Sequence, residues 1–416
     1  MKYFFKKAGF WKTIVFLSLV SHHITAFEGE EEWQEREGFQ SMRVLISGYG
    51  IAGKTMANVF FRAGICPDII ERDQKESLKE GTGIALPANA VWALRKLGFE
   101  KELNERAMRI NNMSFSKPDG EILTTRSVSD IHPEGIPFMA LHRKSLSEML
   151  EFPISHLPVS YKTTVTKLEE KEREVVVTFN TGITKTYDLV IGADGIHSQI
   201  RSLLYPQALH PIYQGIFTWR TVVDLEEGPQ NPVYMMGANT FFLIYPIGKE
   251  GEYYIYAHQM REKRERETPE KEAATFLEIF RTYGGDVPRI LKKIHPQDIV
   301  TGFIENVSEV LWGEGRVVLM GDAAHACAPG LQQGGAQTIE DGFVWSEEFQ
   351  RAGMSLDDII RNFKARRQMR VQKVVEASNM RMKLMSQEDM ETRYHAIREN
   401  GPLNRPGFIT IMQSNP

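Results

Sequence analysis

The chain has 416 residues and is 42% hydrophobic, which is enough apolar material to bury a large core in one composite unit. Its formal net charge of −4 at pH 7 gives no reason to expect nucleic acid or an anionic membrane as a partner. The two cysteines, Cys66 and Cys327, form neither a disulfide framework nor the spacing of a metal site, so we expect a reducing compartment and no bound metal.

The first 41 residues resemble a secretory signal or a non-native N-terminal extension. Lysines at positions 2, 6, 7 and 12 precede the short apolar stretch 14–20, and a sequence that could be cleaved ends at Ala26. The stretch is too short to span a membrane. Because Met42 stands immediately before the first predicted strand, we expect it to be the true or ancestral start. A native chain cut after Ala26 would instead indicate export.

The segment after Met42 is predicted to form a strand, a glycine-rich turn and a helix. The apolar run 44–47 is typical of a buried parallel strand, and residues 51–64 follow as a helix. Glycines in such a turn let backbone N–H groups approach a pyrophosphate and let the helix pack closely on the strand. The turn and the start of the helix contain four small residues: Gly48, Gly50, Ala52 and Gly53.

A second strand, residues 68–71, ends in an acidic residue at the spacing expected for a dinucleotide fold. Glu71 stands about 20 residues after the turn, where a carboxylate can accept hydrogen bonds from both ribose hydroxyls. Arg72 follows directly and could reach the adenosine side of a nucleotide. These features predict a dinucleotide site but leave NAD, NADP and FAD open, with an ordinary glycine turn as the alternative.

The middle of the chain contains further strand and turn signals. Residues 111–126 are expected to form a hairpin, with Asp119-Gly120 as the turn signal. A helix is expected from Arg143, and a buried strand at 188–192 then runs into Asp194-Gly195 and a short helix. From residue 211 to about residue 304 the pattern is rich in strands.

The last part of the chain begins with a buried strand at residues 316–320, which ends in Gly321-Asp322. Pro329 and a glycine-rich helix start follow, and the latter contains Gly334, Gly335 and Ala336. A long helix at about 356–384 carries a basic run, which we expect to be a solvated helix face rather than a nucleic-acid site. The run consists of Arg366, Arg367, Arg370 and Lys373. No structure is predicted after about Met390.

Taken in this order, the segments around Gly48, Asp194 and Asp322 resemble those of the single-component FAD-dependent monooxygenases. This is the family of the salicylate- and hydroxybenzoate-type hydroxylases, urate hydroxylase and the tetracycline-inactivating monooxygenases. The resemblance extends from about residue 42 to about residue 380. One departure lies at Gln332-Gln333-Gly334, where many relatives have Gly-Gln-Gly, so the turn must use other dihedral angles or Gln332 must project toward the flavin.

The resemblance implies an α/β fold in which a Rossmann-like FAD-binding domain is interleaved with a β-sheet substrate domain, followed by a long C-terminal helix. It assigns the FAD-binding domain to residues 42–110, 143–210 and 305–354, the substrate domain to a hairpin at 111–142 and a sheet at 211–304, and the C-terminal helix and tail to 355–416.

The resemblance also gives roles to individual residues of the FAD site. Asp322 would accept hydrogen bonds from the ribityl chain, and the helix start at Gly334, Gly335 and Ala336 would direct its N–H groups at the flavin. Arg143 would lie beside the isoalloxazine ring or the phosphates. Asp194 and Gly195 would bridge FAD and the path of the nicotinamide. The alternatives are helix capping for Asp322 and Asp194, and a surface position for Arg143.

The implied activity is hydroxylation of a small aromatic or polyketide-like substrate with NADPH or NADH and O2, through a flavin C4a-hydroperoxide. Arg220 would bind a substrate carboxylate or carbonyl, and Pro329 would help to keep the pocket dry. His258, Tyr213 and His325 are the candidates for a base. A cytoplasmic location is favoured because the reductant is cytoplasmic. A flavin reductase or desaturase of a lipid-like substrate and a non-catalytic FAD-binding module remain alternatives, and the sequence is silent on oligomeric state.

Overall fold

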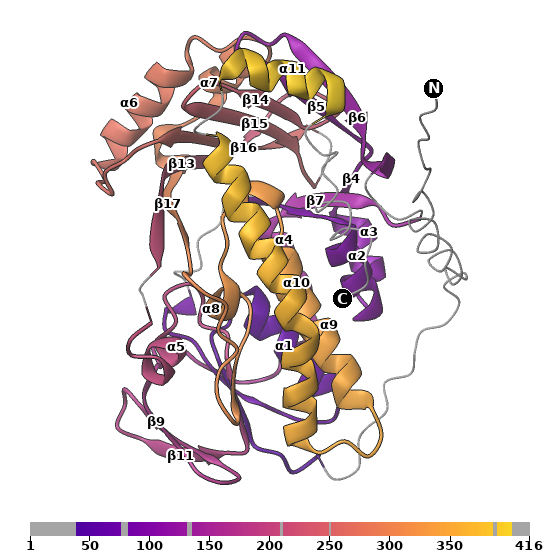
Figure 1. The fold of residues 1–416 in the computed structure, drawn as a ribbon, viewed down its shortest axis with the longest axis vertical. Helices are drawn as coiled ribbons and strands as arrows, with labels where there is room; N and C mark the ends of the chain where they lie inside the picture. The colour runs from indigo at the N-terminus through magenta and orange to yellow at the C-terminus, as the bar shows by residue number, and fades with distance from the viewer. Residues whose placement is uncertain are drawn as a thin grey trace, which may run out of the picture. The chain divides into compact units, whose positions relative to one another are not determined.

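The structure is a computed structural model that describes residues 39–75, 82–130, 135–208, 211–248, 251–385 and 389–401, all within one compact unit of the chain (Figure 1). The expected signal-like segment that ends at Ala26 lies outside the described residues. The domain boundaries given above stay a prediction. Among the described helices, none combines the length and the hydropathy needed to cross a membrane.

A five-stranded parallel sheet carries the glycine-rich turn. Its strands are, in spatial order, β18 (Val317–Leu319), β12 (Leu189–Gly192), β1 (Val44–Ser47), β2 (Asp68–Ile70) and β8 (Val159–Ser160). All neighbouring strands pair in parallel. β1 and β12 are buried along their whole length, which explains their uninterrupted apolar sequences.

Two glycines allow helix α1 (Ile51–Arg62) to pack closely after β1. Gly48 has a φ of 106°, and a Cβ atom there would lie 2.3 Å from the backbone oxygen of Ala193. A Cβ atom on Gly53 would lie 1.9 Å from the backbone oxygen of Gly48. Only glycine fits at both positions, which confirms the predicted strand–turn–helix unit.

A second, seven-stranded sheet is built mostly from the segment predicted to be rich in strands. Its strands are, in spatial order, β17 (Val300–Asn306), β13 (Ile212–Asp224), β16 (Glu252–Met260), β15 (Thr240–Pro246), β14 (Val233–Met236), β5 (Asn112–Ser116) and β6 (Ile122–Ser127). β5 and β6 pair as an antiparallel hairpin, as predicted. β14 pairs in parallel with β5, which joins this hairpin to the rest of the sheet.

The two faces of the seven-stranded sheet have different partners. Helices α6 (Pro269–Phe280) and α7 (Val287–Lys293) cover one face, where Phe242 of β15 packs with Phe276 and Phe280 (Figure 1). Successive strand residues point to opposite faces, so Phe241 and Leu243 join a different cluster. This second face is the one available to a ligand.

The remaining strands and helices lie outside the two large sheets. Two small antiparallel sheets are formed by β3 (Gly83–Leu86), β7 (Phe138–His142) and β4 (Met108–Ile110), and by β11 (Thr184–Tyr187), β10 (Val175–Phe179) and β9 (Val165–Glu170). The other helices are α2 (Ala88–Lys96), α3 (Glu100–Arg106), α4 (Arg143–Glu151), α5 (Gln199–Leu204), α8 (Asp322–His325), α9 (Gly334–Gln350), α10 (Leu356–Met385) and α11 (Met390–Asn400). The predicted α/β class with a long C-terminal helix is confirmed.

Helix α9 is packed between α1, α2 and α10, and a buried set of charges fixes it to α10. Arg367 of α10 is fully buried, and its Nε and Nη1 donate hydrogen bonds to Asp341 Oδ1 at 2.8 Å and Glu340 Oε2 at 2.6 Å. Arg370 Nη2 also donates to Glu340 at 2.7 Å. We call these four residues, together with His325, the α9–α10 ion network.

The network continues from α9 to the loop after β18. Asp341 Oδ2 lies 2.7 Å from His325 Nε2 and accepts a hydrogen bond from the backbone N–H of Gly321 at 2.9 Å. Burial alone would raise the pKa of Asp341, but its interactions with His325 and Arg367 outweigh burial and hold that pKa below its usual range. The network therefore joins α10, α9 and the loop before Asp322 through ionised groups.

The prediction of a solvated basic face on α10 is wrong for most of the basic run. Lys373 is exposed, but Arg367 is fully buried, and the Arg370 side chain is only 10% exposed. Arg366 is half-buried between Glu347 and Glu348. The sequence pattern misled because the acidic partners lie on α9, about 20–30 residues earlier in the chain.

We expect Arg367→Met to destabilise the fold by about 3–5 kcal/mol, because it leaves two buried carboxylates without their shared cation. The matched control is Arg361→Met on the same helix, where an exposed ion pair with Asp358 is lost and the cost should stay below about 1 kcal/mol. Urea unfolding of both variants measures the difference. Equal losses in the two variants would show that the buried pairing contributes nothing special to stability.

Candidate functional site

A cavity of about 810 Å³ lies between the C-terminal ends of the parallel strands and the second face of the seven-stranded sheet. This is the edge at which ligands bind in open parallel sheets. The part of the cavity next to the parallel sheet is lined by the turns after β1, β12 and β18 and by the start of α9. The residues at this end include Gly50, Ile51, Ala52, Ala193, Gly195, Asp322, Gly334 and Gly335. We call it the cofactor end.

The shape of the cofactor end fits a large nucleotide cofactor. A Cβ atom built on Gly50 or Gly334 would meet no atom within 4 Å, so both backbones border open space in the cavity. The first N–H groups of α9 have no partner within the helix and can donate to a ligand there. The resulting partial positive charge would stabilise negative charge on a ring placed against it. The glycine turn and the α9 start therefore fit FAD.

Several predicted cofactor residues line the cavity, as the prediction requires. Arg143 is the first residue of α4, and its exposed side chain borders the cavity together with Asp322, Gly195 and Ala52. Asp322 is exposed at the start of α8, and the structure finds no side-chain cap for that helix. The roles of these residues toward FAD stay a prediction, which their positions support.

Other predicted cofactor residues lie behind the cavity. Gly48 and Gly53 act in the turn described above, and Ala336 is buried in α9. Arg72 is exposed, 3.8 Å from Asp73, and does not border the cavity.

Glu71 holds the glycine turn in place. Its Oε2 accepts a hydrogen bond from the backbone N–H of Tyr49 at 2.8 Å, and its Oε1 accepts one from Asp73 at 2.9 Å. Each carboxylate oxygen can still accept a second hydrogen bond, for example from a ribose hydroxyl.

Asp194 has the capping role that was its alternative. Its carboxylate accepts hydrogen bonds from Ser198 Oγ at 2.5 Å and from the backbone N–H of Gln199 and Ile200 at 2.8 and 3.1 Å. The short helix begins at Gln199, with Ser198 as its cap. Asp194 does not border the cavity, whereas its neighbours Ala193 and Gly195 do.

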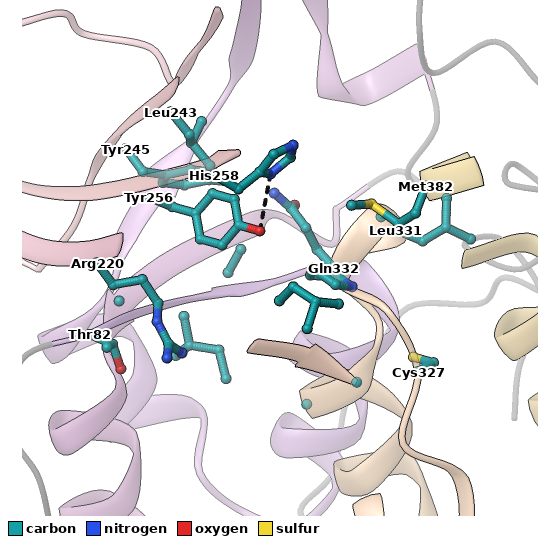
Figure 2. A pocket seen from close by; sticks show the side chains of 18 of the residues that line it. Thr82, Arg220, Leu243, Tyr245, Tyr256, His258, Cys327, Leu331, Gln332 and Met382 are labelled. Carbon is teal, nitrogen blue, oxygen red and sulfur yellow. Dashed lines mark hydrogen bonds between the residues drawn. The ribbon is translucent and has the colours of Figure 1, made fainter. Parts of the chain in front are cut away.

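The other half of the cavity, which we call the substrate end, is lined by the seven-stranded sheet (Figure 2). Arg220 of β13 lies on one side, and its Nε is buried without a hydrogen-bond partner among the described residues. Four buried or half-buried tyrosines share this end: Tyr234, Tyr245, Tyr254 and Tyr256. Apolar side chains complete it: Met113, Phe115, Phe138, Met236, Phe241 and Leu243.

His258 lies at the substrate end in a neutral form. Its ring stacks on Phe241 with centroids 5.1 Å apart, and Nδ1 shares a 3.3 Å hydrogen bond with the Tyr256 hydroxyl. Burial, aided by the positive charge of Arg393, lowers the pKa of His258 to about 3. A side chain with so low a pKa is a weak base, so its position favours a role in shaping the cavity.

Of the other candidate catalytic residues, one borders the cavity and two do not. Pro329 borders the cavity in the short helix η5 (Pro329–Leu331). Tyr213 does not border it, and its hydroxyl donates to the backbone oxygen of Arg261 at 2.6 Å. His325 is held in the ion network. Tyr213 and His325 are therefore placed where they cannot reach a ligand in the cavity.

The sequence leaves two expectations for Gln332, altered dihedral angles in its loop or a side chain that projects toward the flavin. The residue adopts the left-handed conformation, with φ 57° and ψ 29°. This region costs an L-residue about 1–2 kcal/mol relative to glycine. The side chain borders the cavity, so the second expectation, a projection toward the ligand space, is supported.

Sequence reasoning missed the contribution of α11. Arg393, Ala396 and Ile397 of this helix border the cavity, in a region where no structure was predicted. A signal was present, because Asp389 caps the helix by accepting a hydrogen bond from the backbone N–H of Thr392. Met382 of α10 also borders the cavity, whereas Met380 is exposed.

The described residues contain no group of three or more His, Cys, Asp or Glu side chains arranged to hold a metal ion. Cys327 borders the cavity, and burial raises the pKa of its thiol to about 12, so it is protonated at neutral pH. The polar groups of the site are therefore arginine, carboxylate, imidazole, amide, hydroxyl and backbone groups.

Residues 41–378 match a protein family described as FAD binding domain. The chain is 30% identical over 307 residues to the aurachin C monooxygenase/isomerase of Stigmatella aurantiaca, with 73% of this chain and 79% of that protein aligned. It is 32% identical over 313 residues to the 2-heptyl-3-hydroxy-4(1H)-quinolone synthase of Pseudomonas aeruginosa (strain UCBPP-PA14), with the same shares aligned. The solved structure of HpxO of Klebsiella pneumoniae, complexed with FAD and uric acid, matches with a TM-score of 0.83 at 24% identity and covers 91% of this chain and 98% of that one. This last likeness confirms the fold.

A pair of glycine variants separates folding from cofactor binding. Gly50→Ala should leave stability within about 0.5 kcal/mol of the wild type, because its Cβ meets no protein atom, yet weaken FAD binding at least about tenfold by filling the cofactor space. Gly53→Ala should instead lose about 1–3 kcal/mol of stability or fail to fold, because its Cβ overlaps the Gly48 backbone.

Urea unfolding of the protein without FAD and titration of FAD followed by its fluorescence measure the two effects. Unchanged FAD affinity in Gly50→Ala would show that the cofactor does not approach this turn.

The neutral state of His258 predicts acid sensitivity. In the unfolded chain this histidine becomes protonated below about pH 6.5, whereas in the folded chain it stays neutral down to about pH 3. The free energy of unfolding therefore falls as the pH drops from 6.5 to 3. Between pH 7.5 and pH 5 this histidine should lower the free energy of unfolding by about 2 kcal/mol. The His258→Phe variant should therefore lose about 2 kcal/mol less unfolding free energy than the wild type over the same pH interval. The variant His295→Asn, which changes an exposed histidine, should lose as much as the wild type.

Urea unfolding at the two pH values measures both. A His258→Phe variant as acid-sensitive as the wild type would contradict a buried neutral imidazole.

Proposed function

We propose that this chain, which belongs to the family of single-component FAD-dependent monooxygenases, hydroxylates a small, electron-rich aromatic ring that contains nitrogen. The observation that carries the proposal is that the cofactor end and the substrate end form one continuous cavity. Relatives named monooxygenases favour this activity over the flavin reductase and the non-catalytic module considered from the sequence.

FAD would be held by residues of the parallel-sheet edge. The turn at Gly50 would receive the pyrophosphate, Asp322 the ribityl hydroxyls, and the α9 start at Gly334 the polar edge of the ring. When bound, FAD supplies the redox and oxygen chemistry, with NADPH or NADH as the reductant and O2 as the oxidant. The protein's own task is then to place the substrate ring beside that cofactor and to exclude water.

The side chains at the substrate end suit a flat, largely neutral ring. Phe115 and Phe241 offer aromatic faces, and His258 is uncharged. Arg220 borders the cavity, and its guanidinium group can donate to a carbonyl or carboxylate oxygen on the substrate. The name of one relative contains a 4(1H)-quinolone and the HpxO structure contains uric acid, and both compounds are nitrogen heterocycles with ring carbonyl groups.

The apolar walls would protect the reaction. Water that enters such a site diverts the oxidant into useless peroxide, so the cavity must be closed by side chains that do not hold water. Leu331, Met382 and Ile397 come from η5, α10 and α11 and border the cavity. Leu331 and Met382 lie on the side away from Arg220 (Figure 2). We infer that these elements shield the substrate, and that the protein works in the cytoplasm, where the reductant is available.

The proposal predicts coupled turnover. The full chain loaded with FAD should oxidise NADPH or NADH faster when the right ring is added, with hydroxylated product formed in near one-to-one ratio to the reductant and little peroxide. Alkylquinolones, hydroxypyridines and purines form the test panel, and simple phenols, whose rings contain no nitrogen, form the matched control. Peroxide and product are quantified together. Coupled turnover of the phenols alone would reject the nitrogen-containing class, and accelerated oxidation that yields only peroxide would reject hydroxylation.

A further inference from the structure

The backbone at Gln332 is held in a conformation that glycine would adopt more easily. Among the described residues, only Lys162 and Gln332 combine a side chain with a positive φ. Lys162 is exposed in a loop, whereas Gln332 borders the cavity. A glycine at position 332 would relieve the strain and leave the turn intact. The glutamine side chain is therefore not required by the turn, which points to another role for it.

The contacts of Gln332 orient its amide. The Tyr234 hydroxyl donates to Met113 Sδ at 3.6 Å, which leaves its oxygen to accept a hydrogen bond from Gln332 Nε2 at 3.0 Å. Tyr234 is itself fixed by stacking on Phe115, with ring centroids 4.9 Å apart and planes inclined by 22°. The amide nitrogen is thus anchored to the sheet, and the orientation of the amide group follows from it.

The amide oxygen of Gln332 remains available. Gln332 Oε1 has no partner among the described residues, and it is not one of the side-chain atoms sealed from solvent. Figure 2 shows the side chain extending from its loop in the direction of Tyr256 and His258. An anchored amide with an open carbonyl oxygen presents one hydrogen-bond acceptor to the cavity, at a fixed position.

We propose that Gln332 Oε1 is a specificity-determining acceptor, which receives a hydrogen bond from a ring N–H of the substrate. The inference rests on the proposed function and narrows it to N-unsubstituted lactam-like rings, such as 4(1H)-quinolones. A ring nitrogen that donates to an acceptor becomes more electron-rich, which assists attack on the ring by an electrophilic oxidant. The neutral amide leaves the proton on the ring, and the direction of the bond selects which ring carbon faces the cofactor end.

The position of Gln332 supports this role. The loop connects η5, which borders the substrate end, with Gln333 at the start of α9, where the cofactor ring is expected. Gln333 is fully buried and linked to Asn89 and Gln337 by side-chain hydrogen bonds, so the loop is fixed on its inner side. The position of a substrate that binds Gln332 is therefore fixed relative to the start of α9, which would hold the flavin.

The test compares 2-heptyl-4(1H)-quinolone with its 1-methyl derivative, which lacks the N–H. Binding to the FAD-loaded full chain is measured from the change in the flavin absorption spectrum, without reductant. Wild type should bind the N–H compound about tenfold more tightly than the methyl compound, as expected for one hydrogen bond in a dry site. Gln332→Gly should reduce this preference to less than about twofold while its Tm is no lower than that of the wild type.

Two further variants separate recognition from backbone strain. Gln332→Leu keeps the side-chain bulk and removes the acceptor, so it should also lose the preference. Lys162→Gly relieves the other strained position, far from the cavity, and should keep the wild-type preference with a Tm that is no lower. If Gln332→Gly and Gln332→Leu retain the tenfold preference, Gln332 is not the acceptor.

The outcomes distinguish the inference from the proposed function. A wild-type chain that binds neither compound overturns the lactam class, even if another ring is hydroxylated with good coupling. An N–H preference that depends on Gln332, in a protein that forms only peroxide with every ring, supports the recognition role and rejects hydroxylation. Coupled hydroxylation that ignores the Gln332 variants rejects the recognition role alone.

Discussion

The start of helix α9 must be held at one fixed position, because it borders the cofactor end and the substrate end at the same time. Buried charges supply this constraint. Arg367 and Arg370 on α10 bind Glu340 and Asp341 on α9, and Asp341 also holds the backbone before Asp322. A buried charge is tolerated only with its partners in place, so small displacements of α9 are costly. The cofactor-facing N–H groups depend on this arrangement.

Much of the cofactor end could be predicted from sequence because it is encoded by short-range patterns. The buried run before Gly48 and the acid at Glu71 are local signals whose meaning does not depend on distant residues. The structure shows each of these elements, with Glu71 bonded to the turn itself. The seven-stranded sheet and its hairpin were also predictable from alternation and turn residues, since a strand buried on one face reads as a period of two.

The remaining features depend on contacts between distant segments, which the sequence does not display. Arg367 is buried because α9 supplies carboxylates to it, although its neighbours in sequence suggest a solvated face. Tyr213 was a candidate base, yet its hydroxyl donates a hydrogen bond to the backbone oxygen of Arg261. The conformation of Gln332 could not be read from its identity, because a glutamine at positive φ is held by the loop around it and by Tyr234.

Helix α10 connects the ion network that supports the cofactor end to the lining of the cavity. Arg370 binds α9 and Arg381 borders the cavity, and their 11-residue separation (370 to 381) is about three helical turns, which places both on one side of the helix. One inserted or deleted residue between them would rotate one group by about 100° relative to the other. Substitutions on the sheet and on α11 can therefore change the substrate during evolution, whereas insertions and deletions in α10 between these two residues are disfavoured.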